Sequence, residues 1–314
     1  MCALAPDVAR VGRTMLFASL VLALIAISLL VAKPARAVTL TVNNTVDPGD
    51  GDCNPNGGCT LREAINEANT TSADTIGFRF HGGGVNTISP TSRLPTIRER
   101  LTINGYLQPG ATENTAANGT NAVLKIELDG SGAGASAPGI EVQASGCVIK
   151  GLVINRFGGH GVRITSIGPE TQDNRVVGNF IGTNAAGTQD LGNDGAGVYI
   201  DGGADTSDNT VGGSRPEPRN LISGNDLGGV EIYTTDNAIL GNLIGTEKNG
   251  TDALSNSGGG VEILGDASND NIVGGTLPNP PTPSHSIART ASWSTVTTAT
   301  ASCATPSSRM MGSA

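Results

Sequence analysis

Short apolar runs, with Val, Ile or Leu at every second position, recur along most of the chain. From about Gly139 they form a repeat, in which GVRI, GVYI, GVEI and GVEI begin at Gly161, Gly197, Gly229 and Gly260, at intervals of 36, 32 and 31 residues. Alternation of apolar and polar positions predicts short β-strands. A fixed period of this size indicates a repeat architecture.

A second repeat lies between the members of the first. It consists of an Asp-Asn pair followed by apolar residues and glycine, and it begins at Asp173, Asp208, Asp236 and Asp270. Strands this short do not suit a sandwich, and the connections leave no room for crossover helices. We therefore expect an all-β fold, a right-handed parallel β-helix over residues 81–276 with a column of stacked Val, Ile and Leu inside. Gly and Asn suit its bends, and stacked Asn side chains can form hydrogen-bond ladders.

Two polar stretches interrupt the repeats at matching places, at residues 184–195 and 247–259. In a solenoid such insertions should project from one side as paired loops, and binding is often placed on loops held by a rigid scaffold. The alternative is that they are only spacers between strands.

One segment, CTLREAINEAN at residues 59–69, differs from the short strands around it. It predicts an amphipathic helix over residues 60–69. The apolar stripe consists of Leu61, Ala64, Ile65 and Ala68, and the solvated face of Arg62, Glu63, Asn66 and Glu67. Thr60 and Glu63 form a capping box. Because the first coil of a solenoid would expose apolar surface and strand edges, we expect this helix to cover the front end, within a cap of residues 38–80.

The segment before the helix contains candidate cross-links. Cys53 and Cys59 flank a Gly, Asn and Pro loop, which a disulfide closes easily in an oxidising compartment. The alternative is that the two cysteines bind a metal ion, but the sequence offers neither a second cysteine pair nor a nearby His to complete such a site. Asp47, Asp50 and Asp52 carry oxygen ligands suited to Ca²⁺ as a loop-stiffening ion, although solvated acidic turns are commoner.

CTLREAINEAN resembles the signature of the CSLREAI-domain family, with Thr60 in place of the usual Ser. The preceding VTLTVNNTVDPGDGDCNPNGGC and the following ADTIGFRF, LTINGY and IKGLVINRFGGHGV are also similar to that family, from Val38 to about Gly275. Its members are exported bacterial right-handed parallel β-helix proteins, related in pattern to chlamydial polymorphic outer-membrane proteins and to the pectate-lyase-like superfamily. The resemblance implies a fold and an exported location, and it transfers no catalytic residue.

The N-terminal 37 residues have the pattern of a secretory signal. Arg10 and Arg13 precede an apolar run at residues 15–32, and Ala35 and Ala37 occupy the small-residue positions of a cleavage site. Cleavage after Ala37 would release the chain outside the cell or to the cell surface, with no further membrane span. The alternative is a retained membrane anchor.

Charge and composition limit the classes of partner that the chain is expected to bind. The formal net charge is −9, and removal of the signal, with its four basic residues and one acid, makes it about −12. An acidic surface without a Lys or Arg cluster argues against nucleic acid, and it disfavours polyuronates unless a cation bridges them. The 45 glycines and the low aromatic content of 3% agree with an all-β chain.

Candidate catalytic residues are few. GGHGVRI, which contains His160, resembles a fragment of the polygalacturonase pattern. The NTD and DD motifs that supply the carboxylates of that pattern are absent from the sequence. The simpler interpretation of His160 is therefore a bend residue before a strand. Lyase chemistry would need Ca²⁺ held by several Asp beside an Arg base, and Arg156 and Arg163 lie near no evident acidic set. Tyr199 and Tyr233 could contribute hydrogen bonds to a carbohydrate.

We expect an exported structural or adhesive protein that presents loops to a carbohydrate, a surface polymer or another partner, without catalysis and without a required cofactor. The alternative is a polysaccharide lyase or glycoside hydrolase. Residues 277–314 lack Asp and Glu and depart from the repeat. They suit a Pro/Ser/Thr-rich linker to an anchor, or a frame-shifted or truncated sequence.

Overall fold

The computed structural model describes residues 38–47, 51, 53, 58–70, 74–168, 170–265 and 269–274. The expected signal (1–37) and the atypical tail (277–314) lie outside these residues. Within the described ranges the chain forms short β-strands, three short 3-10 helices and one α-helix. No helix in this part of the chain is long and apolar enough to cross a membrane.

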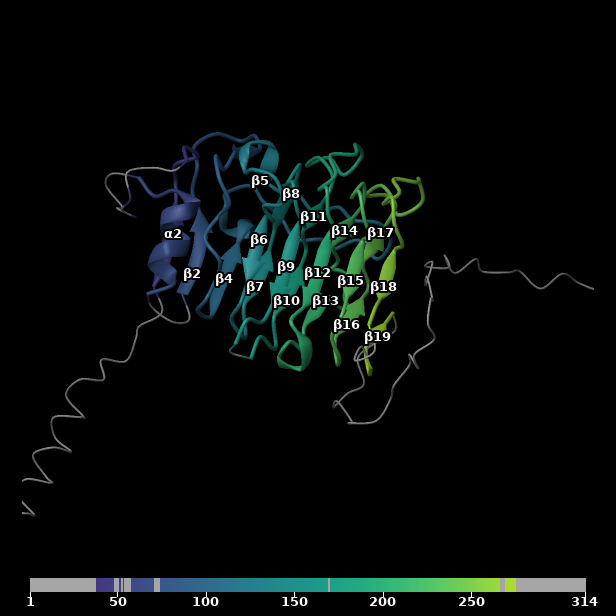
Figure 1. Cartoon of the computed structure of the whole chain (residues 1–314). Coiled ribbons are helices and arrows are strands. Elements are labelled where there is room, and N and C mark those ends of the chain that lie inside the picture. The colour runs from purple at the N-terminus through teal and green to yellow at the C-terminus, as the bar shows by residue number, and fades with distance from the viewer. Residues whose placement is uncertain are drawn as a thin grey trace, which may run out of the picture. The chain divides into compact units, whose positions relative to one another are not determined.

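The strands form three sheets in which neighbours pair in parallel (Figure 1). The first sheet contains β1 (Thr39–Val42), β2 (Asp74–Phe78), β4 (Leu101–Asn104), β7 (Val148–Lys150), β10 (Arg175–Val177), β13 (Thr210–Gly212), β16 (Ala238–Leu240) and β19 (Ile272–Val273). The second contains β3 (Asn86–Ile88), β5 (Ile126–Asp129), β8 (Leu152–Asn155), β11 (Phe180–Ile181), β14 (Leu221–Ile222) and β17 (Leu243–Ile244). The third contains β6 (Ile140–Val142), β9 (Val162–Thr165), β12 (Val198–Asp201), β15 (Val230–Ile232) and β18 (Val261–Ile263).

From β4 onward the chain visits the three sheets in a fixed rotation. β4, β5 and β6 lie in the first, second and third sheets, and β7, β8 and β9 repeat that order, as do the later strands. One such passage is called a coil below. Each strand pairs with the equivalent strand of the neighbouring coil. The prediction of an all-β fold rich in parallel strands is confirmed.

The repeated GVxI sequences supply the core side of the third sheet. Val162, Val198 and Val230 are register partners across β9, β12 and β15, and the isoleucines two positions later are partners in the same way. All these side chains are buried. Burial of apolar surface stabilises by roughly 25 cal/mol per Å². Each coil is therefore stabilised mainly by the apolar surface that it buries against its two neighbours.

Three columns of asparagines, all buried except the partly exposed Asn242, mark the corners between the sheets. They contain Asn174, Asn209, Asn237 and Asn271; Asn179, Asn220 and Asn242; and Asn193, Asn225 and Asn256. Within a column, each side-chain Nδ2 donates to Oδ1 of the next coil, as from Asn174 to Asn209 at 2.9 Å. The backbone N–H of Asn174 also donates to this Oδ1, at 3.1 Å. The ladders expected from the sequence are present.

Backbone geometry explains the Asp-Asn repeat. Asp173, Asp208, Asp236 and Asp270 have φ values of 57°, 55°, 61° and 56°. Asp and Asn are enriched in this left-handed region, which most other residues avoid. The chain turns at the aspartate and places the following asparagine in the first ladder. The repeated pair therefore has a structural role.

The helix α2 (Leu61–Ala68) packs against β1 and β2, at one end of the first sheet (Figure 1). Its predicted apolar stripe is buried. The N–H of Glu63 donates to Thr60 Oγ1 at 3.3 Å, and the N–H of Thr60 donates to Glu63 Oε2 at 2.8 Å. The capping box is thus present, and the helix covers the first strands of this sheet.

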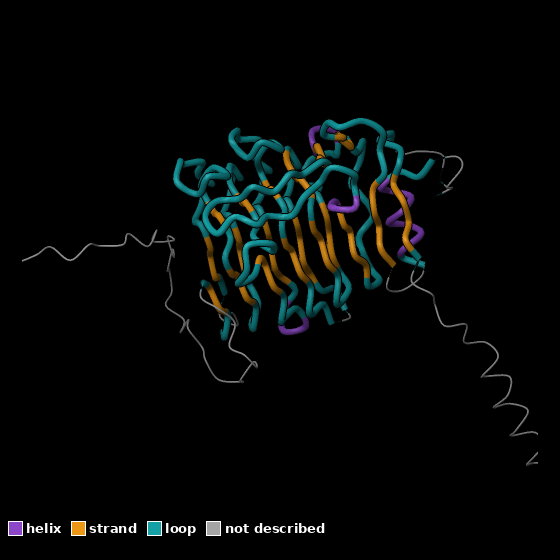
Figure 2. The backbone as a smooth tube through the Cα atoms, turned by 180° about the vertical axis from the view of Figure 1, so that it is seen from behind, coloured by secondary structure: helices purple, strands orange, loops and turns teal. Residues whose placement is uncertain are grey.

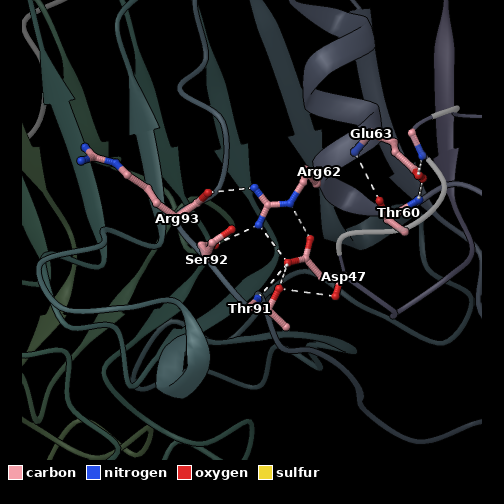
Figure 3. Close-up of polar contacts among 8 residues, drawn as sticks. Asp47, Thr60, Arg62, Glu63, Thr91, Ser92 and Arg93 are labelled. Carbon is pink, nitrogen blue, oxygen red and sulfur yellow. Dashed lines mark hydrogen bonds and ion pairs between the residues drawn. The ribbon is translucent and has the colours of Figure 1, made fainter.

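The prediction of a solvated polar face on α2 is wrong for Glu63, which is 4% exposed, and for Arg62. The side chain of Arg62 is 15% exposed and pairs with Asp47, which is 3% exposed, through an Nε to Oδ1 distance of 2.7 Å. Arg62 also donates to the carbonyls of Ser92 and Arg93, and Asp47 accepts from Thr91 (Figure 3). Helical spacing identifies the polar side of a helix, but it does not show which segment packs against that side.

The predicted disulfide between Cys53 and Cys59 is present. The N–H of Cys59 donates to Asn43 Oδ1 at 2.8 Å, and its carbonyl accepts from the N–H groups of Asn43 and Asn44. These bonds attach the segment before α2 to the chain that follows β1.

A long loop at residues 108–125 lies over the outer face of the second sheet, where loop segments cross the strands in Figure 2. The guanidinium of Arg219 donates to three of its carbonyls, of Ala116, Ala117 and Gly119, at 3.3, 3.0 and 2.6 Å. Leu124 of the loop packs in a cluster with outward side chains of this sheet, Val153, Phe180 and Leu221. Coils far apart in the sequence are therefore joined directly.

The ladders predict a large effect of one buried amide. Asn209→Ala removes the acceptor of the Nδ2 and backbone N–H groups of Asn174, and an unpaired buried donor costs about 1–3 kcal/mol. We expect a loss of about 2–4 kcal/mol in the free energy of unfolding, measured with denaturant. The exposed control Asn118→Ala should stay within about 0.5 kcal/mol of wild type. A loss below about 1 kcal/mol for Asn209→Ala would contradict the role given to the ladder.

The covering role of α2 is tested at Ile65, which is fully buried. Ile65→Asp places an unpaired carboxylate in an apolar contact, and we expect aggregation or loss of folding, measured by size-exclusion chromatography and circular dichroism. Asn66→Asp, at the neighbouring exposed position, is the matched control and should behave as wild type. A soluble, monomeric Ile65→Asp protein with an unchanged unfolding midpoint would exclude this role.

Candidate functional site

A hollow of about 340 Å³ lies where the chain enters the third sheet. Its lining comes from four successive coils, at residues 136–138 before β6, 158–160 before β9, 194–195 before β12 and Leu227 before β15. Gly195 allows the coils beside the hollow to approach closely, because a Cβ there would lie 2.7 Å from His160 Nδ1 and 2.9 Å from the backbone of Gly159. The hollow therefore runs along one corner of the stack of coils.

His160 lies at the bend before β9, as predicted, but it does not stand alone. Its ring stacks on Tyr199, with ring centroids 4.1 Å apart and planes 18° apart. The N–H of Ala196 donates to His160 Nδ1 at 3.0 Å. Burial, and then the charge of Arg163, lower the pKa of His160 to about 4. The imidazole is neutral at neutral pH, and one of its nitrogens is engaged by the backbone.

Tyr199 and Tyr233 continue this aromatic stack to the next coil. Their ring centroids are 5.3 Å apart, with planes at 46°. His160 covers one face of Tyr199, and the guanidinium carbon of Arg163 lies 5.8 Å from the ring centroid of Tyr199. Burial, and then the charge of Asp201, raise the pKa of Tyr199 to about 12, so its hydroxyl remains a donor. These rings pack on one another, which leaves hydrogen bonding as the main polar contribution of Tyr199 to a ligand.

The expectation that Arg156 and Arg163 lie near no acidic set is wrong. Arg163 Nη2 lies 3.0 Å from Asp201 Oδ2, and its Nη1 lies 3.8 Å from Glu141 Oε1. Arg156 Nε lies 2.9 Å from Asp129 Oδ1. These partners come from neighbouring coils, so their proximity depends on a register that one sequence repeat does not reveal.

Two acidic residues of the third sheet, Glu231 and Glu262, were not predicted from the sequence. They are register partners on β15 and β18, and Glu231 in turn pairs with Tyr199. Their Oε1 atoms accept the N–H groups of Gly228 and Gly259, at 3.1 and 2.7 Å. Burial raises the pKa of Glu231, the hydrogen bond from Gly228 opposes the rise, and the charge of Glu262 adds to it. The identical GVEI repeats were the available signal.

The two polar insertions do contact each other, because the N–H of Lys248 donates to the carbonyl of Gly187 at 2.9 Å. The carbonyl of Lys248 accepts from Thr120 of the 108–125 loop at 2.7 Å. Of residues 184–195 and 247–259, only Asp194 and Gly195 line the hollow. The candidate site therefore lies at the corner of the third sheet, away from most of these insertions.

Of the three predicted Ca²⁺ ligands, the structure describes only Asp47. Both carboxylate oxygens of Asp47 accept hydrogen bonds from Arg62, and Asp50 and Asp52 lie outside the described residues. Burial raises the pKa of Asp47, but the hydrogen bonds and charge of Arg62 and the hydrogen bonds of Thr91 outweigh it, so that the pKa is lowered. Among the described residues, no group of three or more His, Cys, Asp or Glu side chains could hold a metal ion.

The lowered pKa of His160 predicts a pH dependence. The unfolded state takes up a proton near the ordinary value, whereas the folded state takes it up only near pH 4, so stability is fully present above about pH 6.5 and is lost as the pH falls toward 4. We expect His160→Asn, which keeps an acceptor for the Ala196 N–H, to lose less stability than wild type over this range. Denaturant unfolding at several pH values measures the difference. An imidazole that titrates near 6.5 by NMR in the folded protein would contradict the assignment.

Comparison with known families and curated proteins identifies no relative of this chain. Neither a scan against protein-family models nor a search of curated proteins finds a match. The resemblance to the CSLREAI-domain family thus remains a prediction from the sequence, and the function must be inferred from the site.

Proposed function

We propose that this chain is an exported structural or adhesive protein, built on a right-handed parallel β-helix of the CSLREAI type, that binds an extended surface polymer without transforming it. The fixed rotation through three parallel sheets supports the β-helix. The Cys53–Cys59 disulfide and the signal-like N-terminus support export.

The observation that carries the binding proposal is the path of the hollow across four coils. Adjacent strands of a sheet are about 4.8 Å apart, so four coils span about 15 Å along the stack. That length accommodates a few units of an extended polymer lying lengthwise.

The lining favours a polysaccharide. Pro138 and Leu227 contribute apolar surface, whereas Asp194, Arg163 and Tyr199 contribute hydrogen-bonding groups. Sugar rings present both hydroxyl groups and apolar C–H faces, so they match a mixed surface of this kind. In this proposal the binding surface is the corner of the third sheet, and the insertions at 184–195 and 247–259 serve mainly to pack against the 108–125 loop.

The polar groups of the hollow are engaged in ways that suit binding better than catalysis. Arg163 is shared between Asp201 and Glu141, and His160 Nδ1 accepts a backbone hydrogen bond. A general base must be able to take a proton from the substrate. The low pKa of His160 makes it a weak base at neutral pH.

Glu231 and Glu262 keep a second candidate function open. Glycoside hydrolases use a pair of carboxyl groups, one of which has a raised pKa and acts as the acid. These two residues are neighbours, and the pKa of Glu231 is raised. Both side chains also accept backbone hydrogen bonds, which favours a structural role.

Occlusion of the hollow tests the proposal. Leu227 lines the hollow and is 47% exposed, so Leu227→Arg places a long side chain at the hollow. The control Ile167→Arg introduces the same residue at a position that is 74% exposed and outside the lining. We expect Leu227→Arg to weaken binding of a soluble glucan oligomer at least about tenfold, and Ile167→Arg to leave it unchanged. Calorimetry measures the binding, and thermal unfolding checks that both variants fold.

Two results would overturn this function. One is equal binding by wild type and Leu227→Arg. The other is release of new reducing ends or unsaturated products from a polysaccharide panel at more than about one turnover per second, abolished by Glu231→Gln, which would establish the enzymatic alternative.

A further inference from the structure

A second cavity, of about 540 Å³, lies along β1, at the end of the stack where α2 is found (Figure 1). It is called the edge groove below. Its lining consists of residues 38–41 and Asn43 from β1 and the chain beside it, and of Cys53, Cys59, Arg79 and His81. Four residues of a strand extend about 13 Å. The groove therefore follows β1 for most of its length.

The groove lies against an open strand edge. Within the described residues, β1 is the last strand of the first sheet and pairs only with β2. The carbonyl of Val42 accepts from the N–H of Arg79, which follows β2, at 2.9 Å. Because the backbone groups of successive strand residues point to alternate sides, those of Thr39 and Thr41 point away from β2. Both threonines line the groove, so their N–H and C=O groups are placed to pair with a further strand.

The helix α2 covers a different side of β1. Val42 belongs to the same apolar core as Leu61 of α2, and Leu40 packs against that core. The exposed Thr39 and Thr41 alternate with these two residues along the strand. Since α2 shields the core side of β1, the hydrogen-bonding edge of the strand stays available.

One end of the edge groove can bind a carboxylate. Arg79 lies beside the C-terminal end of β1, because its N–H bonds to Val42. The side chains of Arg79 and His81 are exposed, and no ion pair in the described part of the chain involves either of them. The lining contains no Asp or Glu. A guanidinium binds a carboxylate through two parallel hydrogen bonds, so this end favours an acidic group.

We propose that the edge groove binds an extended segment of another protein, which pairs with β1 as one more parallel strand and places carboxylates beside Arg79 and His81. Addition of a strand to an open sheet edge is a general mode of peptide recognition. The Cys53–Cys59 disulfide holds one wall of the groove in place before binding. This surface shares no lining residue with the hollow proposed to bind a polymer.

A second copy of this chain does not supply the acidic group. The other end of the first sheet is β19, and a parallel strand places its C-terminal end beside Arg79. The sequence that follows β19 contains no Asp or Glu. The charge of the groove therefore favours a segment of a different protein.

Three labelled peptides of alternating Val and Thr test the proposal, each with an acetylated N-terminus and an amidated C-terminus. One ends in two glutamates, one in two glutamines and one in two lysines. With the full chain at neutral pH and fluorescence anisotropy, we expect the Glu peptide to bind at least about tenfold tighter than the Gln peptide, and the Lys peptide to bind most weakly. Added salt should reduce these differences.

Backbone methylation distinguishes strand addition from attraction between charges alone. Two further Glu peptides carry N-methyl groups, one at its odd and the other at its even positions, so that each lacks N–H donors along one edge only. We expect one of them to bind like the unmethylated peptide and the other at least about tenfold more weakly. Equal affinities of these two peptides would exclude pairing with β1.

Matched variants of the chain locate the site. Arg79→Gln should reduce the preference for the Glu peptide to about threefold or less and leave binding of the Gln peptide unchanged. The control Arg175→Gln changes an exposed arginine of β10, in the same sheet but outside the lining, and should change nothing. Thr39→Pro removes a donor that faces the groove and should weaken all the peptides. Arg79→Gln remains decisive should the proline variant fold poorly.

The outcomes decide this inference without affecting the polymer proposal. Failure of the Glu peptide to bind, or a preference for it that Arg79→Gln leaves intact, would overturn the inference. Self-association of the chain that rises with concentration and that Thr39→Pro abolishes would assign the edge to a second copy, and would overturn it as well.

Discussion

The hydrogen bond from one asparagine side chain to the next, repeated at the three corners, is the interaction on which the rest of the structure depends. After the first asparagine of each column, every Oδ1 accepts both a side-chain and a backbone N–H from the preceding coil, as Asn209 does from Asn174. Buried polar groups are costly when unpaired, so a coil shifted along its path would lose several such bonds together. The ladders thus fix the register in which apolar columns stack inside and functional groups align outside.

This register also creates the candidate site. Because equivalent bends lie above one another, the glycine-rich segments before β6, β9, β12 and β15 form a continuous hollow. The same alignment stacks His160 on Tyr199 and places Glu231 beside Glu262. A rigid scaffold can present such a surface without ordering a flexible loop on binding, which reduces the entropy lost by the complex.

The sequence predicted what depends on local pattern. Alternating apolar positions predicted the strands, asparagines at the bends of the repeats predicted the ladders, and the spacing of Thr60 and Glu63 predicted the cap of α2. Partners in different coils could not be predicted, because the path from coil to coil varies. Asn179 is 41 residues from its ladder partner Asn220, whereas Asn220 is only 22 from Asn242. The same variation hid the partners of Arg156 and Arg163, and the 108–125 loop was missed because it matches no repeat.

Hydrogen exchange in the presence of a saturating glucan oligomer can show whether a polymer binds along the corner of the third sheet, because it locates the ligand along the chain. We expect backbone amides at residues 158–160, 194–196 and 226–229 to gain protection together, since residues of these bends line one hollow across successive coils. The insertions at 184–190 and 247–252 should show no change. Protection confined to those insertions, with none at the bends, would place binding on the loops and exclude the corner of the third sheet as the binding surface.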